Sequence, residues 1–204
     1  MKKFIYLIVL ILIVIGVSMM TSKKVQEVAV ISTKYGDMVI EFYPEIAPMH
    51  VESFKILANE GYFNGTLFHR VIPGFVIQGG DPNSKLDDRS IHGTGGRAGK
   101  FFGIGDENDS STWLIPQEFN ATPHVKGTLS MARTNDPNSA SSQFFICHDV
   151  ASFLDNNYTV FGQVIDGLET IDSIVNLEKD LREDRKSTRL NSSHVRTSRM
   201  PSSA

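Results

Sequence analysis

The residues best suited to chemistry lie in the segment Phe68–Asp81, on what we expect to be two short strands around a Pro-Gly turn. Arg70 is permanently charged and holds its N–H donors in a rigid plane. If such a donor points at the nitrogen of a twisted X–Pro amide, it stabilises the twisted form more than the planar form. Amide rotation needs no nucleophile, metal or general base, so an arginine of this kind permits catalysis of amide rotation through differential binding.

Catalysis of this kind also needs an apolar pocket for the pyrrolidine ring and polar groups that hold the peptide backbone. Phe75, Phe145 and Leu154 are the candidates for the pocket, and they come from three different segments. Gln78 is the candidate for the backbone contact, because the period of two along a strand places it on the same side as Val76.

The segment Phe68–Asp81 resembles the signature of the cyclophilins, which are prolyl cis/trans isomerases. The resemblance runs from about Val28 to Leu177, and the further matching motifs are Gly127–Arg133, Ser141–Ile146 and Val160–Gly162. It implies a peptidyl-prolyl cis-trans isomerase (EC 5.2.1.8) that needs no cofactor and no metal. The implied partners are proline-containing peptides and unfolded proteins.

By position, the resemblance assigns the catalytic role to Arg70. The implied substrate-binding residues are Phe75, Val76, Gln78, Ala132, Arg133, Phe145, Phe153, Leu154 and Tyr158. Ala132 and Arg133 are expected to act through main-chain groups. Three positions depart from the best-studied relatives, which have Met at Val76, Trp at Phe153 and His at Tyr158. The missing indole N–H suggests weak cyclosporin binding, but we expect isomerase activity to be retained.

The elements that must position these residues are mostly short β-prone runs. We expect strands at 28–33, 38–42, 67–71, 75–78, 128–132, 143–147 and 160–165. A helix should begin at Pro48 and end at Gly61, and a second should cover 167–177 with Leu168 facing inward. This pattern predicts a mainly β protein, a closed antiparallel eight-stranded cyclophilin-like barrel with two capping helices. The resemblance implies that its last strand is missing by truncation.

Residues 1–20 differ from the rest of the chain. Two lysines precede an apolar run from Phe4 to Val17, which indicates either a cleaved signal peptide or an uncleaved membrane anchor. Both alternatives predict an exported protein in the cell envelope, periplasmic or otherwise extracytoplasmic. The isomerase domain is expected to cover 28–183.

Residues 184–204 have no apolar periodicity and resemble the translation of a short-read sequencing adapter. We therefore expect a non-native tail, and the alternative is a basic tail that binds an acidic partner. The tail carries five of the 20 basic and one of the 23 acidic residues. The preceding chain therefore has 15 basic and 22 acidic residues, a net charge of −7, which argues against nucleic-acid binding.

Several other functions receive little support from the sequence. Cys147 is the only cysteine, so no intrachain disulfide can form. The glycines of 93–100 do not have the spacing of a phosphate-binding loop, and a surface loop is the plainer interpretation. The alternative to an isomerase is a non-catalytic module or chaperone that holds proline-containing segments. We expect a monomer.

Overall fold

The computed structural model describes residues 26–177 and 194–200. The predicted signal or anchor (1–20) and most of the predicted tail lie outside the described residues. Within the described part of the chain, no helix combines the length and apolarity needed to cross a bilayer. The segment Glu27–Ser198 forms one compact unit, and it holds all the candidate site residues.

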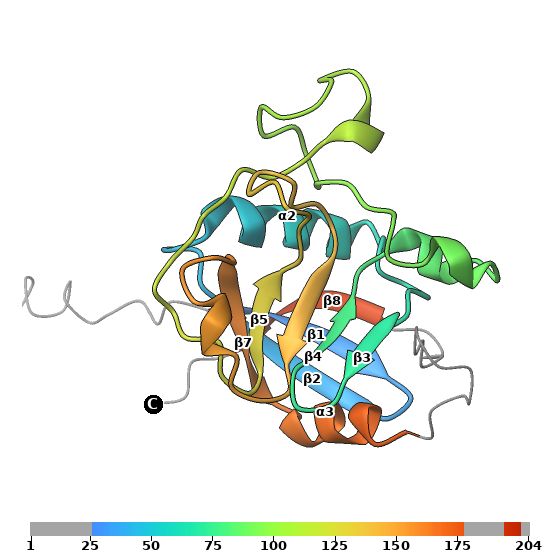
Figure 1. The fold of residues 1–204 in the computed structure, drawn as a ribbon, viewed down its shortest axis with the longest axis vertical. Coiled ribbons are helices and arrows are strands. Elements are labelled where there is room, and N and C mark those ends of the chain that lie inside the picture. Colours follow the sequence, from blue (N-terminus) through green and yellow to red (C-terminus); the bar gives the residue numbers. More distant parts are fainter. Residues whose placement is uncertain (1–25, 178–193, 201–204) are drawn as a thin grey trace, which may run out of the picture. The chain divides into compact units, whose positions relative to one another are not determined.

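The unit is built on one eight-stranded sheet with the order β3-β4-β6-β5-β7-β2-β1-β8. The strands are β1 (Gln26–Thr33), β2 (Gly36–Phe42), β3 (Arg70–Ile72), β4 (Val76–Gly79), β5 (Thr128–Met131), β6 (Phe144–Cys147), β7 (Val160–Asp166) and β8 (His194–Met200). Every strand pair from β3 to β1 is antiparallel. Figure 1 shows the sheet curling, with β1 and β2 behind β4 and β5. The mainly β fold with two helices is thus confirmed, while closure of the sheet into a barrel stays a prediction.

Two helices cover opposite ends of the curled sheet (Figure 1). α2 (Pro48–Asn59) begins with proline at its first turn and buries the predicted stripe of Val51, Phe54, Leu57 and Ala58. α3 (Leu168–Val175) buries Ile171, Ile174 and Val175. The prediction that Leu168 faces inward is wrong, because this side chain is 37% exposed at the first position of the helix.

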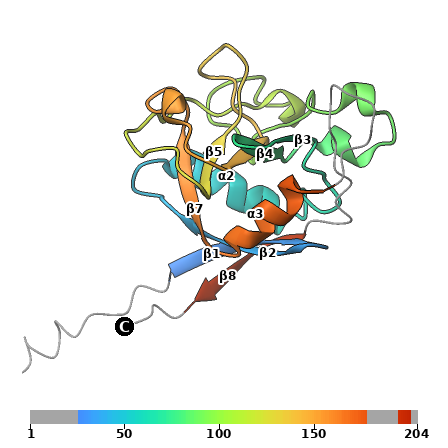
Figure 2. The same cartoon turned by 60° about the horizontal axis from the view of Figure 1, so that its bottom comes forward.

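β8 lies next to β1 at one edge of the sheet (Figure 2). The sequence implied that the last strand is missing, and the structure instead places His194–Met200 on this edge. The physical reason is that an edge strand presents backbone N–H and C=O groups that pair with almost any extended segment. The pairing therefore says nothing about the origin of residues 184–204, and the non-native tail stays a prediction.

The alternation along the central strands creates two separate apolar clusters. Ile77, Ile146 and Leu129 are register partners on β4, β6 and β5, and they face the main core, which also contains α2. The intervening residues point to the opposite face and form a second apolar cluster. Its buried members are Val76, Phe145, Cys147, Ala151 and Leu154, with Phe75, Ala132 and Tyr158 packed against them. Both faces of these strands are therefore covered, which explains why every residue of β5 and β6 and three of the four residues of β4 are buried.

The long connection between β4 and β5 is mostly irregular. It contains the short 3-10 turns η1 (Pro82–Lys85), η2 (Arg89–Ile91) and η3 (Ser110–Thr112), each preceded by an aspartate that accepts a hydrogen bond from a backbone N–H two residues later. The part around η3 projects away from the sheet at the top of Figure 1. A fourth turn, η4 (Ser152–Leu154), carries Phe153 and Leu154 after β6.

Candidate active site

A row of four directly opposed residues crosses the sheet at the candidate site. Arg70 on β3 is the register partner of Gln78 on β4, Gln78 pairs with Phe145 on β6, and Phe145 pairs with Ser130 on β5. Directly opposed residues project to the same face of a sheet. The predicted arginine, glutamine and phenylalanine are therefore aligned by strand register on the face of the second apolar cluster.

Arg70 is exposed at the border of this cluster. Its Nη1 donates a hydrogen bond to Oε1 of Gln78 at 3.2 Å, and its guanidinium carbon lies 5.7 Å from the centre of the Phe75 ring. Within the described residues this is the only hydrogen bond of the side chain. The remaining N–H donors of the guanidinium are thus available to a ligand that lies on the cluster.

The tight turn between β3 and β4 places Phe75 beside Arg70. Gly74 has a φ of +74°, a conformation that glycine adopts without strain. The N–H of Gly74 donates to Nδ1 of His148 at 2.9 Å, and the N–H of His148 donates to the carbonyl of Phe75 at 2.8 Å. His148, directly after β6, therefore fixes the turn between β3 and β4.

Gln78 is itself held by a second glutamine that sequence reasoning did not assign. Nε2 of Gln78 donates to Oε1 of Gln143 at 3.0 Å, and Nε2 of Gln143 donates to the carbonyls of Gly93 (3.0 Å) and Gly95 (2.7 Å). The chain of amides orients the oxygen of Gln78 toward Arg70. Gln143 lies two residues before Phe145, so the period of two along β6 was a signal that could have found it.

The loop that receives Gln143 is fixed by a buried carboxylate. Asp81 is fully buried and accepts hydrogen bonds from the backbone N–H groups of Asn83 (3.0 Å), Gly93 (2.5 Å) and Gly95 (3.1 Å). The glycine-rich segment is thus an ordered part of the site's surroundings. Its role could not be inferred locally, because Gly93 and Gly95 are 12 and 14 residues from Asp81.

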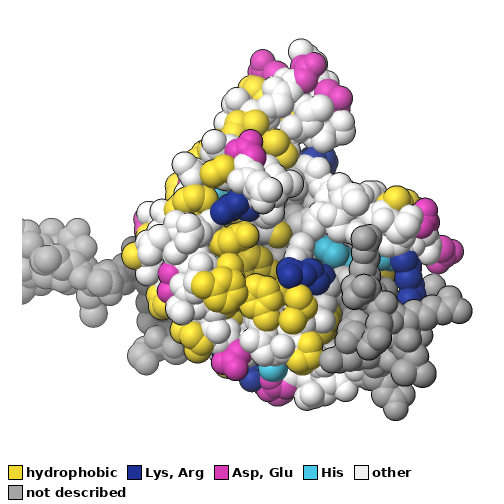
Figure 3. Space-filling view, in the orientation of Figure 1, with side chains coloured by type: hydrophobic (Ala, Val, Ile, Leu, Met, Phe, Trp, Pro, Cys, Tyr) yellow, Lys and Arg dark blue, Asp and Glu magenta, His cyan; other side chains and the backbone are white. Residues whose placement is uncertain are grey.

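The aromatic members of the cluster contact one another. Phe145 is 5% exposed and meets the Tyr158 ring edge-on, with centroids 5.8 Å apart. Phe153 is 70% exposed and lies with its ring centre 5.4 Å from that of Phe75. Phe153 therefore extends the cluster onto the surface. Figure 3 shows hydrophobic side chains gathered into a patch on this face, with lysine or arginine side chains at its border.

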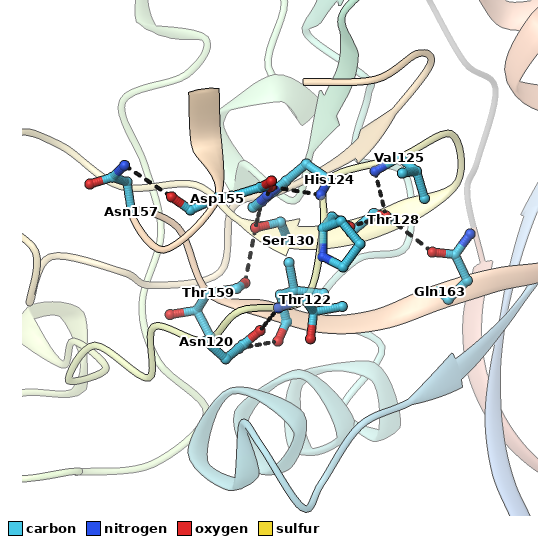
Figure 4. A network of polar contacts seen from close by, with 12 residues as sticks. Asn120, Thr122, His124, Val125, Thr128, Ser130, Asp155, Asn157, Thr159 and Gln163 are labelled. Atoms are coloured by element: carbon cyan, nitrogen blue, oxygen red, sulfur yellow. Dashed lines mark hydrogen bonds and ion pairs between the residues drawn. The ribbon is translucent and has the colours of Figure 1, made fainter. Parts of the chain in front are cut away.

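A network of polar contacts surrounds His124 (Figure 4). The His124 ring stacks on Phe145 with centroids 5.9 Å apart. Its Nδ1 lies 2.9 Å from Oδ1 of Asp155 and its Nε2 lies 3.0 Å from Oγ of Ser130. Hydrogen bonds from the backbone N–H and the side chain of His124 lower the pKa of Asp155, so this partner stays ionised. The network was missed because His124 and Asp155 are 31 residues apart.

The remaining predicted residues lie at the same cluster. The N–H of Ala132 donates to the carbonyl of Gln143 at 2.9 Å, and the guanidinium of Arg133 covers the Tyr158 ring. Cys147 is fully buried, and burial raises the pKa of its thiol to about 12. That thiol is therefore protonated and serves as packing. All ten predicted residues thus meet around one apolar surface.

The chain is similar to a family of known proteins. A family model described as "Cyclophilin type peptidyl-prolyl cis-trans isomerase/CLD" matches residues 28–195. A Brucella abortus protein named "Probable peptidyl-prolyl cis-trans isomerase" is 41% identical over 153 residues, which cover 73% of this chain and 71% of that protein. A peptidyl-prolyl cis-trans isomerase of Synechococcus elongatus is 38% identical over 155 residues, which cover 75% and 92%.

The fold is similar to a solved structure as well. The crystal structure of a Cryptosporidium parvum cyclophilin type peptidyl-prolyl cis-trans isomerase has a TM-score of 0.68 and 29% sequence identity. The match covers 87% of this chain and 99% of that one. The same Cryptosporidium protein was also solved in the presence of the dipeptide Ala-Pro.

Proposed function

Since the chain belongs to the cyclophilin-type peptidyl-prolyl cis-trans isomerases, we propose that it accelerates X–Pro rotation with Arg70 as the catalytic donor and the second apolar cluster as the proline site. The observation that carries this proposal is the position of Arg70. Its free donors lie at the border of the cluster, and the Arg70–Gln78 hydrogen bond orients the guanidinium.

The reaction needs help only at its barrier, which is about 18–20 kcal/mol for peptide rotation. As the X–Pro bond twists, the prolyl nitrogen loses conjugation, becomes pyramidal and gains a lone pair. A guanidinium N–H can then donate to that nitrogen, whereas the planar nitrogen is a poor acceptor. The interaction is therefore stronger in the transition state than in the ground state, which is the condition for catalysis.

The second apolar cluster would hold the pyrrolidine ring while the preceding carbonyl turns. Phe75, Val76, Phe145 and Leu154 would contact the ring, and Gln78 and the main chain at Ala132 would contact the peptide backbone. We propose proline-containing peptides and unfolded proteins as substrates. The Cryptosporidium relative solved in the presence of Ala-Pro supports this choice of ligand.

Replacement of the guanidinium tests the mechanism. Removal of one preorganised donor lowers kcat on the order of 100-fold in comparable cases, so we expect R70A to lose a factor of about 100 in kcat/KM for an Ala-Pro peptide. R70K should be only partly active, because lysine keeps the charge and lacks the planar donors. The rates would be measured by NMR exchange spectroscopy, which needs no coupled protease.

The matched control is R89A, which removes an exposed arginine in η2, outside the second apolar cluster. It should leave kcat/KM within about twofold of the unaltered protein. An R70A rate equal to that of the unaltered protein would contradict the arginine mechanism. Peptide binding by the unaltered protein without any turnover would instead favour the non-catalytic binding module.

We further propose that the domain acts outside the cytoplasm, on exported proteins. The support is the charged start and the apolar run of residues 1–20, which suit a signal peptide or an anchor. N-terminal sequencing of the protein from its native host, after separation of membrane and soluble fractions, tests this. A new N-terminus near residue 20, or an intact one in the membrane fraction, is expected. An intact N-terminus in the cytoplasmic fraction would contradict export.

A further inference from the structure

A second guanidinium, that of Arg133, lies at another border of the second apolar cluster. Arg133 follows β5 directly, and its guanidinium carbon is 4.4 Å from the centre of the Tyr158 ring and 5.5 Å from that of Phe119. Tyr158 in turn contacts Phe145 inside the cluster. Arg70 lies over Phe75 instead, so the two cations are held by different aromatic residues at the rim of the same surface.

Backbone carbonyls hold the Arg133 side chain in place. Nε and Nη2 donate to the carbonyl of Asn157 at 3.2 and 2.8 Å, and Nη1 donates to the carbonyl of Thr134 at 2.8 Å. These bonds and the stacking on Tyr158 fix the guanidinium before any ligand arrives. Because a guanidinium has five N–H groups, at least one on Nη2 remains for a further acceptor.

The charge of Arg133 is not neutralised by a carboxylate within the part of the chain that the structure describes. The side chain of Arg97 shows the contrast, since it also covers a tyrosine ring, at 5.2 Å from Tyr62, but forms an ion pair with Glu60 at 2.8 Å. All partners of Arg133 are neutral oxygens and aromatic faces. The positive charge is therefore both preorganised and available.

We propose that Arg133 is a specificity-determining residue that favours X–Pro segments with aspartate or glutamate next to the X–Pro pair. The inference rests on the proposed function, because it places the substrate proline on the second apolar cluster. When the proline of a peptide lies on this cluster, the neighbouring residues of the peptide pass over the border of the cluster. A carboxylate on one of these residues can then contact Arg133. The chain before residue 184 has a net charge of −7, so its overall field disfavours anionic peptides and a preference for them requires a local cation.

The test uses three peptides that differ only in one residue, glutamate, glutamine or lysine, placed directly before or directly after an Ala-Pro pair. For the unaltered protein we expect kcat/KM to be about two- to fivefold higher for the glutamate peptide than for the glutamine peptide at one of these positions, and lowest for lysine. The difference should shrink when the salt concentration rises from about 20 mM to about 500 mM, because salt screens an exposed ion pair.

Substitution identifies the residue responsible. R133M keeps an unbranched apolar side chain over Tyr158 and should make the glutamate and lysine peptides equally good substrates. R133K should retain the preference for glutamate. R97M is the matched control, since it removes a stacked arginine away from the second apolar cluster, and it should leave the ratio between the two peptides unchanged.

The outcomes separate this inference from the proposed function. Failure of the unaltered protein to turn over any of the peptides would overturn the function itself. Equal rates for all three peptides, or a preference that is insensitive to salt, would overturn only the inference. A glutamate preference that persists in R133M would assign the selectivity to another cation. If R133M does not fold, the salt dependence and the R133K ratio still decide.

Discussion

The roles proposed for Arg70 and Arg133 differ because different groups hold the two side chains. The hydrogen-bond partner of Arg70 is a glutamine side chain, and its other donors are available to a ligand. Arg133 is fixed by the backbone carbonyls of Asn157, Thr134 and Asn135 and by a tyrosine face, so it presents charge with little freedom to move. The first arrangement suits a bond that forms only in the transition state, and the second suits recognition of a charge already present in the ground state.

The protonation of Glu118 should affect stability. Burial alone would raise its pKa, but hydrogen bonds from the His50 side chain and from the backbone N–H groups of Met49 and His50 outweigh burial and lower it. Because the folded pKa lies below the ordinary value of 4.5, the stabilisation is complete above pH 4.5 and is lost as the pH falls through the folded pKa.

We expect E118Q to lower the free energy of unfolding by about 1–2 kcal/mol at pH 7, because the carboxylate satisfies two backbone donors at the start of α2. The difference from the unaltered protein should diminish below pH 4.5. Urea unfolding between pH 3 and pH 7 measures both effects. E107Q, which changes an exposed carboxylate near η3, is the control and should change neither. An E118Q difference that is constant with pH would contradict this account.

At the scale of elements, the same strands serve two apolar clusters with different tasks. The main core joins the inner face of the sheet to α2, and it is closed to solvent. The second apolar cluster joins the outer face to η4, and its aromatic border is exposed. Stability should therefore depend mainly on the first cluster and substrate binding on the second.

A matched pair of substitutions tests this division. L57A in α2 removes a fully buried side chain and should lower the free energy of unfolding by about 2–5 kcal/mol, while kcat/KM of the folded protein stays unchanged. L154A in η4 should cost less stability, because that site is near the surface and can collapse, but it should raise KM. Thermal unfolding and peptide isomerisation kinetics measure the two effects. A larger loss of stability in L154A than in L57A would contradict the division.

The strand limits illustrate what sequence patterns could predict at this scale. The seven expected strands all exist, and both helices begin within a residue of the expected position. The largest error is β3, expected at 67–71 and found at Arg70–Ile72. Phe68 instead packs into the main core before the strand begins. Period and propensity locate an element, but the neighbouring strand decides where its hydrogen bonds start.

At the scale of the whole molecule, the unit Glu27–Ser198 brings the candidate residues together from three regions of the chain. The hairpin of β3 and β4 provides Arg70, Phe75, Val76 and Gln78. The strands β5 and β6 provide the centre of the second apolar cluster, and the turn before β7 provides its opposite border. The export proposal concerns residues 1–20, outside the described part of the chain. All ten candidate site residues lie within the unit Glu27–Ser198.

The sequence by itself determined the candidate segment Phe68–Asp81, because Arg70, the Pro-Gly turn and Gln78 are local and their relation follows from one hairpin. It also determined the mainly β class through its alternating runs. Only the tertiary structure decided that Gln143 links Gln78 to the glycine loop, that His124 and Asp155 support Phe145, and that Arg133 covers Tyr158. These partners lie tens of residues apart, and strand register, which no local pattern encodes, sets which of them meet.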